Sequence, residues 1–138
     1  MVMTNQGNIE KLHENLQAWR SHLLFVSDEM KFIEKLLHSY LFEPRTPKQF
    51  KRWEQFNIDF EKCTDLKDTL VQKIMENEKC LGGVLECASD KHDDHYSEKY
   101  EVLKTEILQF VETYQDLKTG IYNYAGLVLK KKKPLANV

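Results

Sequence analysis

Residues 9–40 read IEKLHENLQAWRSHLLFVSDEMKFIEKLLHSY, and apolar side chains recur along them in alternating steps of three and four. The positions that keep this spacing are Ile9, Leu12, Leu16, Trp19, Leu23, Val26, Met30, Ile33, Leu37 and Tyr40. Because an α-helix has about 3.6 residues per turn, such positions form one apolar seam along its length. The stretch therefore predicts a long helix that buries one face against other helices.

The same pattern recurs twice further along the chain. Near the carboxyl end it comprises Tyr96, Tyr100, Leu103, Ile107, Phe110, Tyr114, Leu117, Ile121, Tyr124 and Val128. In the middle it has two polar interruptions and comprises Trp53, Phe56, Phe60, Cys63, Lys67, Leu70, Ile74, Asn77, Leu81, Val84 and Ala88. A small rotation of the middle helix could bring Leu66 into the seam in place of Lys67. The seam runs through Gly82-Gly83, and we expect the helix to continue there, although glycine weakens helices.

The boundary between the first two helices lies in FEPRTPKQF, residues 42–50. Pro44 disfavours helical geometry at the residue before it. Thr46 is then expected to cap the second helix, with Pro47 as the first helical residue. Gln49 is expected to reach back to the amide of the cap residue, which completes a capping box.

The third helix is expected to end at the lysine run before Pro134, because proline lacks the amide donor of a helix interior. The predicted helices span residues 8–42, 47–86 and 90–132, with flexible termini at 1–7 and 134–138. Short connections make neighbouring helices antiparallel. We predict an all-α fold: one domain, residues 1–138, in which three long helices form an up-down-up antiparallel bundle with heptad-like packing. Two chains sharing a larger bundle is the alternative.

Composition limits the possible classes of function. A net charge of −2, with both signs interspersed, argues against a general nucleic-acid binder. The longest apolar runs are far shorter than the roughly 20 residues that span a bilayer, so no transmembrane segment is expected. Three cysteines are an odd number without a repeating spacing, which indicates reduced thiols and a cytoplasmic protein.

Residues 90–100, DKHDDHYSEKY, combine histidine and aspartate as metal sites do. However, His95 directly precedes the seam residue Tyr96 and so points about 100° away from it. The aspartates also suit the positive amino end of a helix capped by Ser89 or Asp90, and we favour that role. Spacings of Cys-x6-Cys and His-x2-His are looser than usual zinc pairs. The weak metal-ligand candidates are Cys80, Cys87, His92 and His95.

Catalytic motifs are missing from the sequence. A ferritin-like di-iron site needs Glu-x-x-His on two helices, and the chain has one such motif, from Glu10 to His13. No histidine has an acidic residue four positions later, which argues against a hemerythrin-like site. There is no Gly-x-Ser-x-Gly and no phosphate-binding glycine loop. The sequence therefore favours a non-enzymatic protein, with no catalytic or cofactor-binding residues and no cofactor expected.

A second stripe follows the first helix beside its seam: His22, Phe25, Glu29, Phe32 and Leu36. A helix that contacts two neighbours can bury such a broad face completely. Alternatively, the stripe is an exposed patch for self-association or for a protein partner. If Glu29 is buried, its carboxylate needs a Lys, Arg or Tyr from another helix.

The carboxyl-terminal stretch contains the lysine run Lys130, Lys131, Lys132 and Lys133. Lysines at the carboxyl end of a helix complement the helix dipole and keep that end hydrated. We favour this role, and a weak contact with an anionic surface is the alternative.

The run Trp19-x3-Leu23-Leu24-Phe25-x2-Asp28-Glu29-Met30-x-Phe32 places an aromatic residue and an Asp-Glu pair after a tryptophan on the first helix. It resembles a family of short, uncharacterised all-helical proteins of Bacteroidetes-type bacteria, over about the first third of the chain. The resemblance implies a small cytoplasmic helical protein of bacterial origin, and it transfers no catalytic residues.

The function that we expect is a non-enzymatic interaction or assembly module that forms a homodimer or binds a protein partner. Its contact surface would be the broad face of the first helix or the outer face of the third, where Val111, Tyr122 and Leu129 add apolar area. Three alternatives remain: metal-binding or redox chemistry at the cysteine-histidine candidates, association with an anionic surface, and a small-ligand site in the aromatic core. The last would lie near Trp19, Trp53 or Tyr114.

Overall fold

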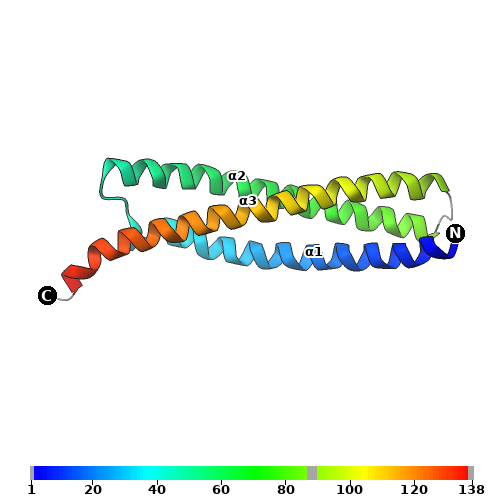
Figure 1. Ribbon diagram of the computed structural model, residues 1–138, viewed down its shortest axis with the longest axis horizontal. Helices are drawn as coiled ribbons and strands as arrows, with labels where there is room; N and C mark the ends of the chain where they lie inside the picture. The colour runs from blue at the N-terminus through cyan, green and yellow to red at the C-terminus, as the bar shows by residue number, and fades with distance from the viewer. Residues whose placement is uncertain (1, 87–89, 137–138) are drawn as a thin grey trace.

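The computed structural model describes the backbone of residues 2–86 and 90–136, and the side chains of residues 10–81 and 98–129. Within these ranges the chain forms three long helices, α1 (Val2–Leu37), α2 (Pro47–Glu86) and α3 (Asp90–Ala136), and a short 3-10 helix, η1 (Tyr40–Phe42). The long helices lie side by side in an elongated up-down-up bundle, and the end of α3 projects beyond the turn between α1 and α2 (Figure 1). The predicted all-α three-helix bundle is confirmed.

The core follows the three predicted seams. Leu16, Leu23 and Ile33 of α1 are fully buried, and they pack in one cluster with Phe110 of α3. Every seam position of α3 whose side chain is described is buried or half-buried. Core side chains therefore line the bundle along most of its length, which is the packing that a three-four repeat predicts.

The polar interruptions of the middle seam are real core positions. Lys67 is 9% exposed whereas Leu66 is 40% exposed, so Lys67 keeps its place in the seam and the alternative rotation toward Leu66 does not occur. Cys63 and Leu70 are buried on either side and hold the helix in its original phase. The aliphatic stem of a lysine can lie in a core while its ammonium reaches a polar partner. Here Lys67 Nζ donates to Ser27 Oγ at 3.2 Å.

Helix α1 ends at Leu37, five residues before the predicted end, and Tyr40 is 73% exposed rather than part of the seam. Two side chains from other helices donate hydrogen bonds to backbone carbonyl oxygens here. Trp53 Nε1 donates to Leu37 O at 2.8 Å, and Tyr124 Oη donates to Phe42 O at 3.3 Å. The hydroxyl of Ser39 accepts from the Leu41 amide and starts η1 instead. These contacts satisfy groups that a longer helix would have paired internally.

The start of α2 follows the predicted cap with one difference. Pro47 is the first helical residue, and Thr46 Oγ1 accepts from the Gln49 amide at 3.1 Å. Gln49 Oε1, however, accepts from the Arg45 amide at 2.8 Å, one residue before the predicted cap amide. The result is a variant of the capping box in which the Gln49 side chain accepts from the amide of Arg45 instead of the amide of Thr46.

The outer ends of the helices differ from prediction more than their centres. Helix α2 continues through Gly82-Gly83 to Glu86 as predicted. Helix α1 already begins at Val2, and α3 runs past Pro134 to Ala136, so the prediction that α3 ends before this proline is wrong. A proline this close to the helix end removes one backbone donor with only two residues still to follow, which limits the cost.

Candidate interaction face

A carboxylate at the junction of α1 and α3 has two partners on the opposite helix. Tyr114 Oη donates to Glu29 Oε1 at 2.6 Å, and Lys118 Nζ donates to the same oxygen at 3.1 Å. The side chains of Glu29 and Lys118 are 22% and 20% exposed. These are partners of the types predicted for a buried glutamate in the α1 stripe, Tyr and Lys from another helix.

Burial and hydrogen bonding act on Glu29 in opposite directions. Burial works to raise the pKa of its carboxyl group, but the hydrogen bonds from Tyr114 and Lys118, with the charges of Lys118 and His22, hold that pKa below its ordinary value. Burial raises the pKa of Tyr114, and the Glu29 carboxylate raises it further. Tyr114 therefore stays a neutral hydrogen-bond donor and Glu29 stays ionised, a stable pairing with a structural role.

A second polar link joins the same two helices nearer the amino end of α1. Asn15 Nδ2 donates to Tyr100 Oη at 2.8 Å, and the ring of Trp19 stacks on Tyr100 with centroids 5.2 Å apart. Tyrosines of the α3 seam thus reach α1 at both links, each with its ring in the core and its hydroxyl at a polar partner.

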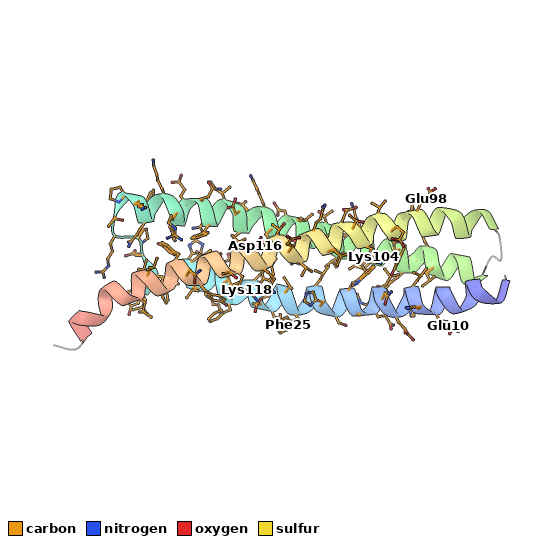
Figure 2. All side chains as sticks on the ribbon, viewed as in Figure 1. Glu10, Phe25, Glu98, Lys104, Asp116 and Lys118 are labelled. Carbon is orange, nitrogen blue, oxygen red and sulfur yellow. The ribbon has the colours of Figure 1, made fainter. Side chains whose placement is uncertain are left out.

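The stripe beside the α1 seam divides into an inner and an outer part. Glu29 and Leu36 are half-buried, and Leu36 packs against the core cluster. Phe25 and Phe32 are 63% and 57% exposed. In Figure 2, Phe25 lies on the outer side of α1 and Lys118 lies where α3 passes α1. The interpretation of the whole stripe as core is therefore wrong, because its two phenylalanines face away from the bundle.

The surface around these phenylalanines continues onto α3. Because α1 and α3 run parallel, the contact between Glu29 and Lys118 places Phe32 and Tyr122 about one turn further along on the same side of each helix. Tyr122 and Leu129 are 39% and 45% exposed, and Val111 is half-buried against the core. We call this surface the α1/α3 face; it comprises Phe25, Phe32, Val111, Tyr122 and Leu129.

The metal-ligand candidates fall largely outside what the structure describes. Cys87 and the side chains of His92 and His95 lie outside the described residues, and Cys80 is half-buried. Among the side chains that are described, no three His, Cys, Asp or Glu gather as a metal site would require. The side chains of Lys130, Lys131, Lys132 and Lys133 also lie outside the described residues, although the α3 backbone continues through them.

The aromatic core positions are occupied by contacts within the chain. Trp19 stacks on Tyr100, Trp53 donates to the Leu37 carbonyl, and Tyr114 donates to Glu29. Cys63 is 4% exposed, and burial raises the pKa of its thiol to about 11, which suits a core side chain. These residues therefore stabilise the bundle.

Two grooves along α2 and α3 were not anticipated from the sequence. One of about 360 Å³ lies around Asn77 and Val102, and one of about 440 Å³ lies around Cys63 and Leu66. The polar interruption of the α2 seam at Asn77 was the available signal for the first groove, but periodicity does not show where two helices separate.

Searches against protein-family models, curated proteins and solved structures found no match to this chain. The resemblance over the first third of the chain therefore stays a prediction. Across the described residues, every helix is too polar or too short in apolar length to cross a membrane.

Proposed function

We propose that this protein is a non-enzymatic assembly module that forms a homodimer through the α1/α3 face. The observation that supports the proposal most directly is the exposure of Phe25 and Phe32, at 63% and 57%, on the side of α1 that faces away from the core. Fully burying a phenylalanine side chain contributes about 1.5–3 kcal/mol. Association with a second protein surface that buries both rings would gain this free energy, whereas both rings stay largely exposed to water in the isolated chain.

A second copy of the chain suits this face because it carries two identical aromatic side chains on one side of α1. Phe25 and Phe32 lie about two helical turns apart, on either side of the midpoint between Asp28 and Glu29. Two copies of α1 that pack antiparallel about that midpoint bring Phe25 of one copy beside Phe32 of the other. A two-fold interface requires this kind of self-complementarity.

Charges near the midpoint allow such an approach. Lys31 Nζ lies 3.7 Å from Asp28 Oδ1, and Lys118 Nζ lies 3.1 Å from Glu29 Oε1. Each carboxylate therefore has a counter-charge within its own chain, which reduces the repulsion between the acidic groups of two copies.

The extent of the face fits a modest dimer interface. From Val111 to Leu129 it spans about 27 Å at 1.5 Å per residue, and two neighbouring helices are about 20 Å wide. This footprint of roughly 500 Å² per copy exceeds the roughly 400 Å² per partner below which most lattice contacts fall, and it is smaller than the roughly 800 Å² per partner of a standard interface. We therefore expect a dimer that dissociates on dilution.

Sedimentation equilibrium over a range of protein concentrations tests the proposal. We expect a reversible monomer–dimer equilibrium for the natural chain, shifted at least tenfold toward monomer by the double substitution Phe25→Gln and Phe32→Gln. Ile58→Gln is the matched control, because Ile58 is 43% exposed on α2, the helix that does not contribute to the face. Circular dichroism should show unchanged helix content in all variants.

Two results would contradict the proposal: a natural chain that stays monomeric at the highest concentration, or a dimer that the double substitution leaves intact.

The cytoplasm is the compartment that we propose for the module, since an odd number of cysteines and the buried free thiol of Cys63 suit a reducing environment.

A further inference from the structure

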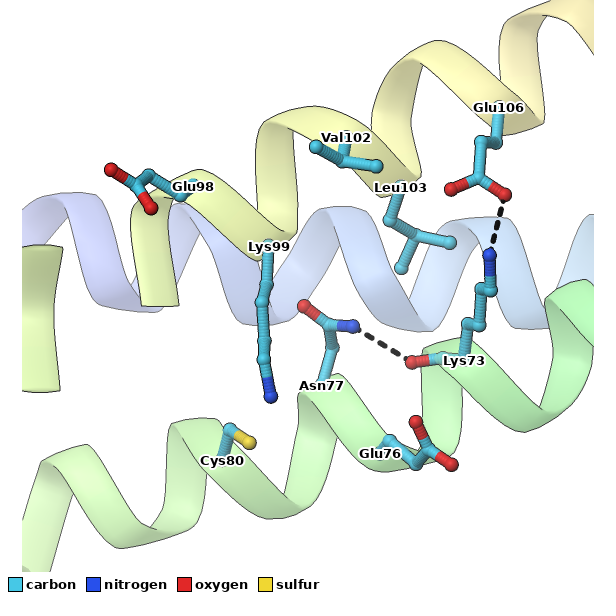
Figure 3. A pocket seen from close by; sticks show the side chains of 9 residues that line it. All are labelled: Lys73, Glu76, Asn77, Cys80, Glu98, Lys99, Val102, Leu103 and Glu106. Atoms are coloured by element: carbon cyan, nitrogen blue, oxygen red, sulfur yellow. Dashed lines mark hydrogen bonds and ion pairs between the residues drawn. The ribbon is translucent and has the colours of Figure 1, made fainter. Parts of the chain in front are cut away.

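The groove between α2 and α3 has the features of a small-ligand site that is independent of the α1/α3 face. It has a volume of about 360 Å³, near the lower limit for small-molecule sites. Figure 3 shows Lys99 and Leu103 of α3 and Lys73 and Asn77 of α2 pointing into the space between the two helices. Its lining residues are Lys73, Glu76, Asn77, Cys80, Glu98, Lys99, Val102, Leu103 and Glu106.

Asn77 brings an unsatisfied acceptor to this groove. The residue is 6% exposed, and its Nδ2 donates to the Lys73 carbonyl oxygen at 2.8 Å. Its Oδ1 has no hydrogen-bond partner among the described residues. In Figure 3 this oxygen is turned away from Lys73, toward the chain of Lys99. A buried acceptor without a partner costs about 1–3 kcal/mol. The oxygen itself has almost no exposed surface, so a donor that displaces the neighbouring chain of Lys99 and reaches the oxygen would remove that cost.

The charged lining favours a cation. Lys73 Nζ pairs with Glu106 Oε2 at 2.7 Å, which leaves the groove with Glu76, Glu98 and Lys99 outside any ion pair among the described side chains. Two carboxylates and one ammonium give these remaining groups a net negative charge. A cation that carries N–H groups satisfies both this charge and the acceptor requirement of the amide oxygen.

The remaining wall is apolar. Val102 is 59% exposed on α3, and Leu103 and Cys80 line the same groove. A short hydrocarbon chain that extends from the cation would cover Val102 and gain free energy in proportion to the apolar area removed from water. The lining thus combines one acceptor, excess negative charge and an apolar wall.

We propose that the groove between α2 and α3 binds a small organic ammonium ion with an apolar tail, whose N–H group donates to Asn77 Oδ1. Neither the dimer nor the α1/α3 face is needed for this site, because its lining residues belong to α2 and α3 alone.

Titration with n-hexylammonium chloride, followed by amide chemical shifts of the uniformly labelled chain, tests the proposal. We expect saturable shifts that cluster around Asn77 and Val102. The comparison probe is n-hexyltrimethylammonium chloride, which carries the same charge and tail but no N–H donor. It should bind at least tenfold more weakly. Equal binding by both probes would overturn the assignment of Asn77 Oδ1 as the acceptor.

The variant Asn77→Leu removes the acceptor and should weaken n-hexylammonium binding at least tenfold. Asn57→Leu is the matched control, because Asn57 Nδ2 makes the same bond to the carbonyl four residues earlier, outside the groove. Lys99→Ala should strengthen binding, since it removes the unpaired cation of the lining. Absence of saturable shifts in the natural chain would show that the groove does not bind the ammonium ion, and the proposal would then be wrong.

Discussion

Tyr114 on α3 donates a 2.6 Å hydrogen bond to the carboxylate of Glu29 on α1. Glu29 lies in the same α1 stripe as Phe25 and Phe32, and the phenolic ring of Tyr114 is fully buried beneath that surface. The bond therefore fixes α1 against α3 directly under the proposed dimer face. A hydrogen bond to a charged group contributes more than one between neutral groups. Among the described residues, this bond therefore links the two helices more strongly than the neutral bond from Asn15 to Tyr100.

Replacing Tyr114 by phenylalanine should lower the free energy of unfolding by about 1.5–3 kcal/mol, because it removes a hydrogen bond to a charged acceptor and keeps the ring. Urea unfolding followed by circular dichroism measures this change. Tyr122→Phe is the control, since Tyr122 is exposed on the same helix, and its effect should stay within about 0.5 kcal/mol. Equal effects of the two substitutions would contradict the structural role of the Tyr114 hydroxyl.

The pH dependence of stability should contain a contribution from Glu29. Its pKa in the folded chain is lower than the ordinary 4.5, so the unfolded chain binds the proton more tightly and protonation favours unfolding. This contribution is fully present above the ordinary pKa and is lost as the pH falls through the lower folded value.

The variant Glu29→Gln isolates that contribution. We expect the natural chain to be the more stable of the two near neutral pH, and the difference to shrink as the medium becomes acidic, because both side chains are then uncharged. Urea midpoints at a series of pH values measure it. A difference that widens toward acid pH would mean that the folded pKa is raised, contrary to the hydrogen bonding at this site.

Lys67→Met should leave the free energy of unfolding unchanged or raise it by about 1 kcal/mol. Replacing a buried ionic group by an apolar side chain of similar shape is often neutral or stabilising. The partners that remain are Asp68, whose side chain is 65% exposed, and Ser27, so no charge is left buried. Lys62→Met, at an exposed position of the same helix, controls for the loss of charge. Destabilisation well beyond that of the control would show that the lysine ammonium itself stabilises the fold.

Two glycines of α3 form a matched pair for substitution by alanine. At Gly126 an added Cβ has no neighbour within 4 Å, and at Gly120 it would lie 3.2 Å from a ring carbon of Phe56. Alanine favours a helix over glycine by about 1 kcal/mol. We expect Gly126→Ala to stabilise the chain by up to this amount, and Gly120→Ala to gain less or to lose stability. Thermal unfolding of both variants decides this, and equal stabilisation would show that the Phe56 ring moves aside freely.

The accuracy of the sequence-based prediction differed along the chain for identifiable reasons. The three seams were confirmed at the described side chains, Tyr40 excepted. Each seam repeats over many turns, so a single polar position such as Lys67 does not shift the phase of the helix. The ends were less accurate, because Leu37 and Phe42 receive hydrogen bonds from Trp53 and Tyr124, residues far away in the sequence. Contacts of this kind leave no local pattern.

The candidate interaction face was only partly predictable. The stripe containing Phe25 and Phe32 was visible as a second periodicity, and the need of Glu29 for a Tyr, Lys or Arg partner followed from its apolar neighbours. The identity of that partner depended on the register between α1 and α3, which sets Tyr114 and Lys118 opposite Glu29. Register between helices depends on how their side chains pack together, and it cannot be deduced from the spacing of residues within one helix.

The spacing of apolar residues was thus enough to specify three long helices, their order and the inner side of each, because helical periodicity is a local property of the chain. Only the packed bundle showed that Phe25 and Phe32 lie outside and that the oxygen of Asn77 lacks a partner among the described residues. Exposure and hydrogen-bond satisfaction depend on what the neighbouring helices cover, and that is set by how α1, α2 and α3 lie against one another.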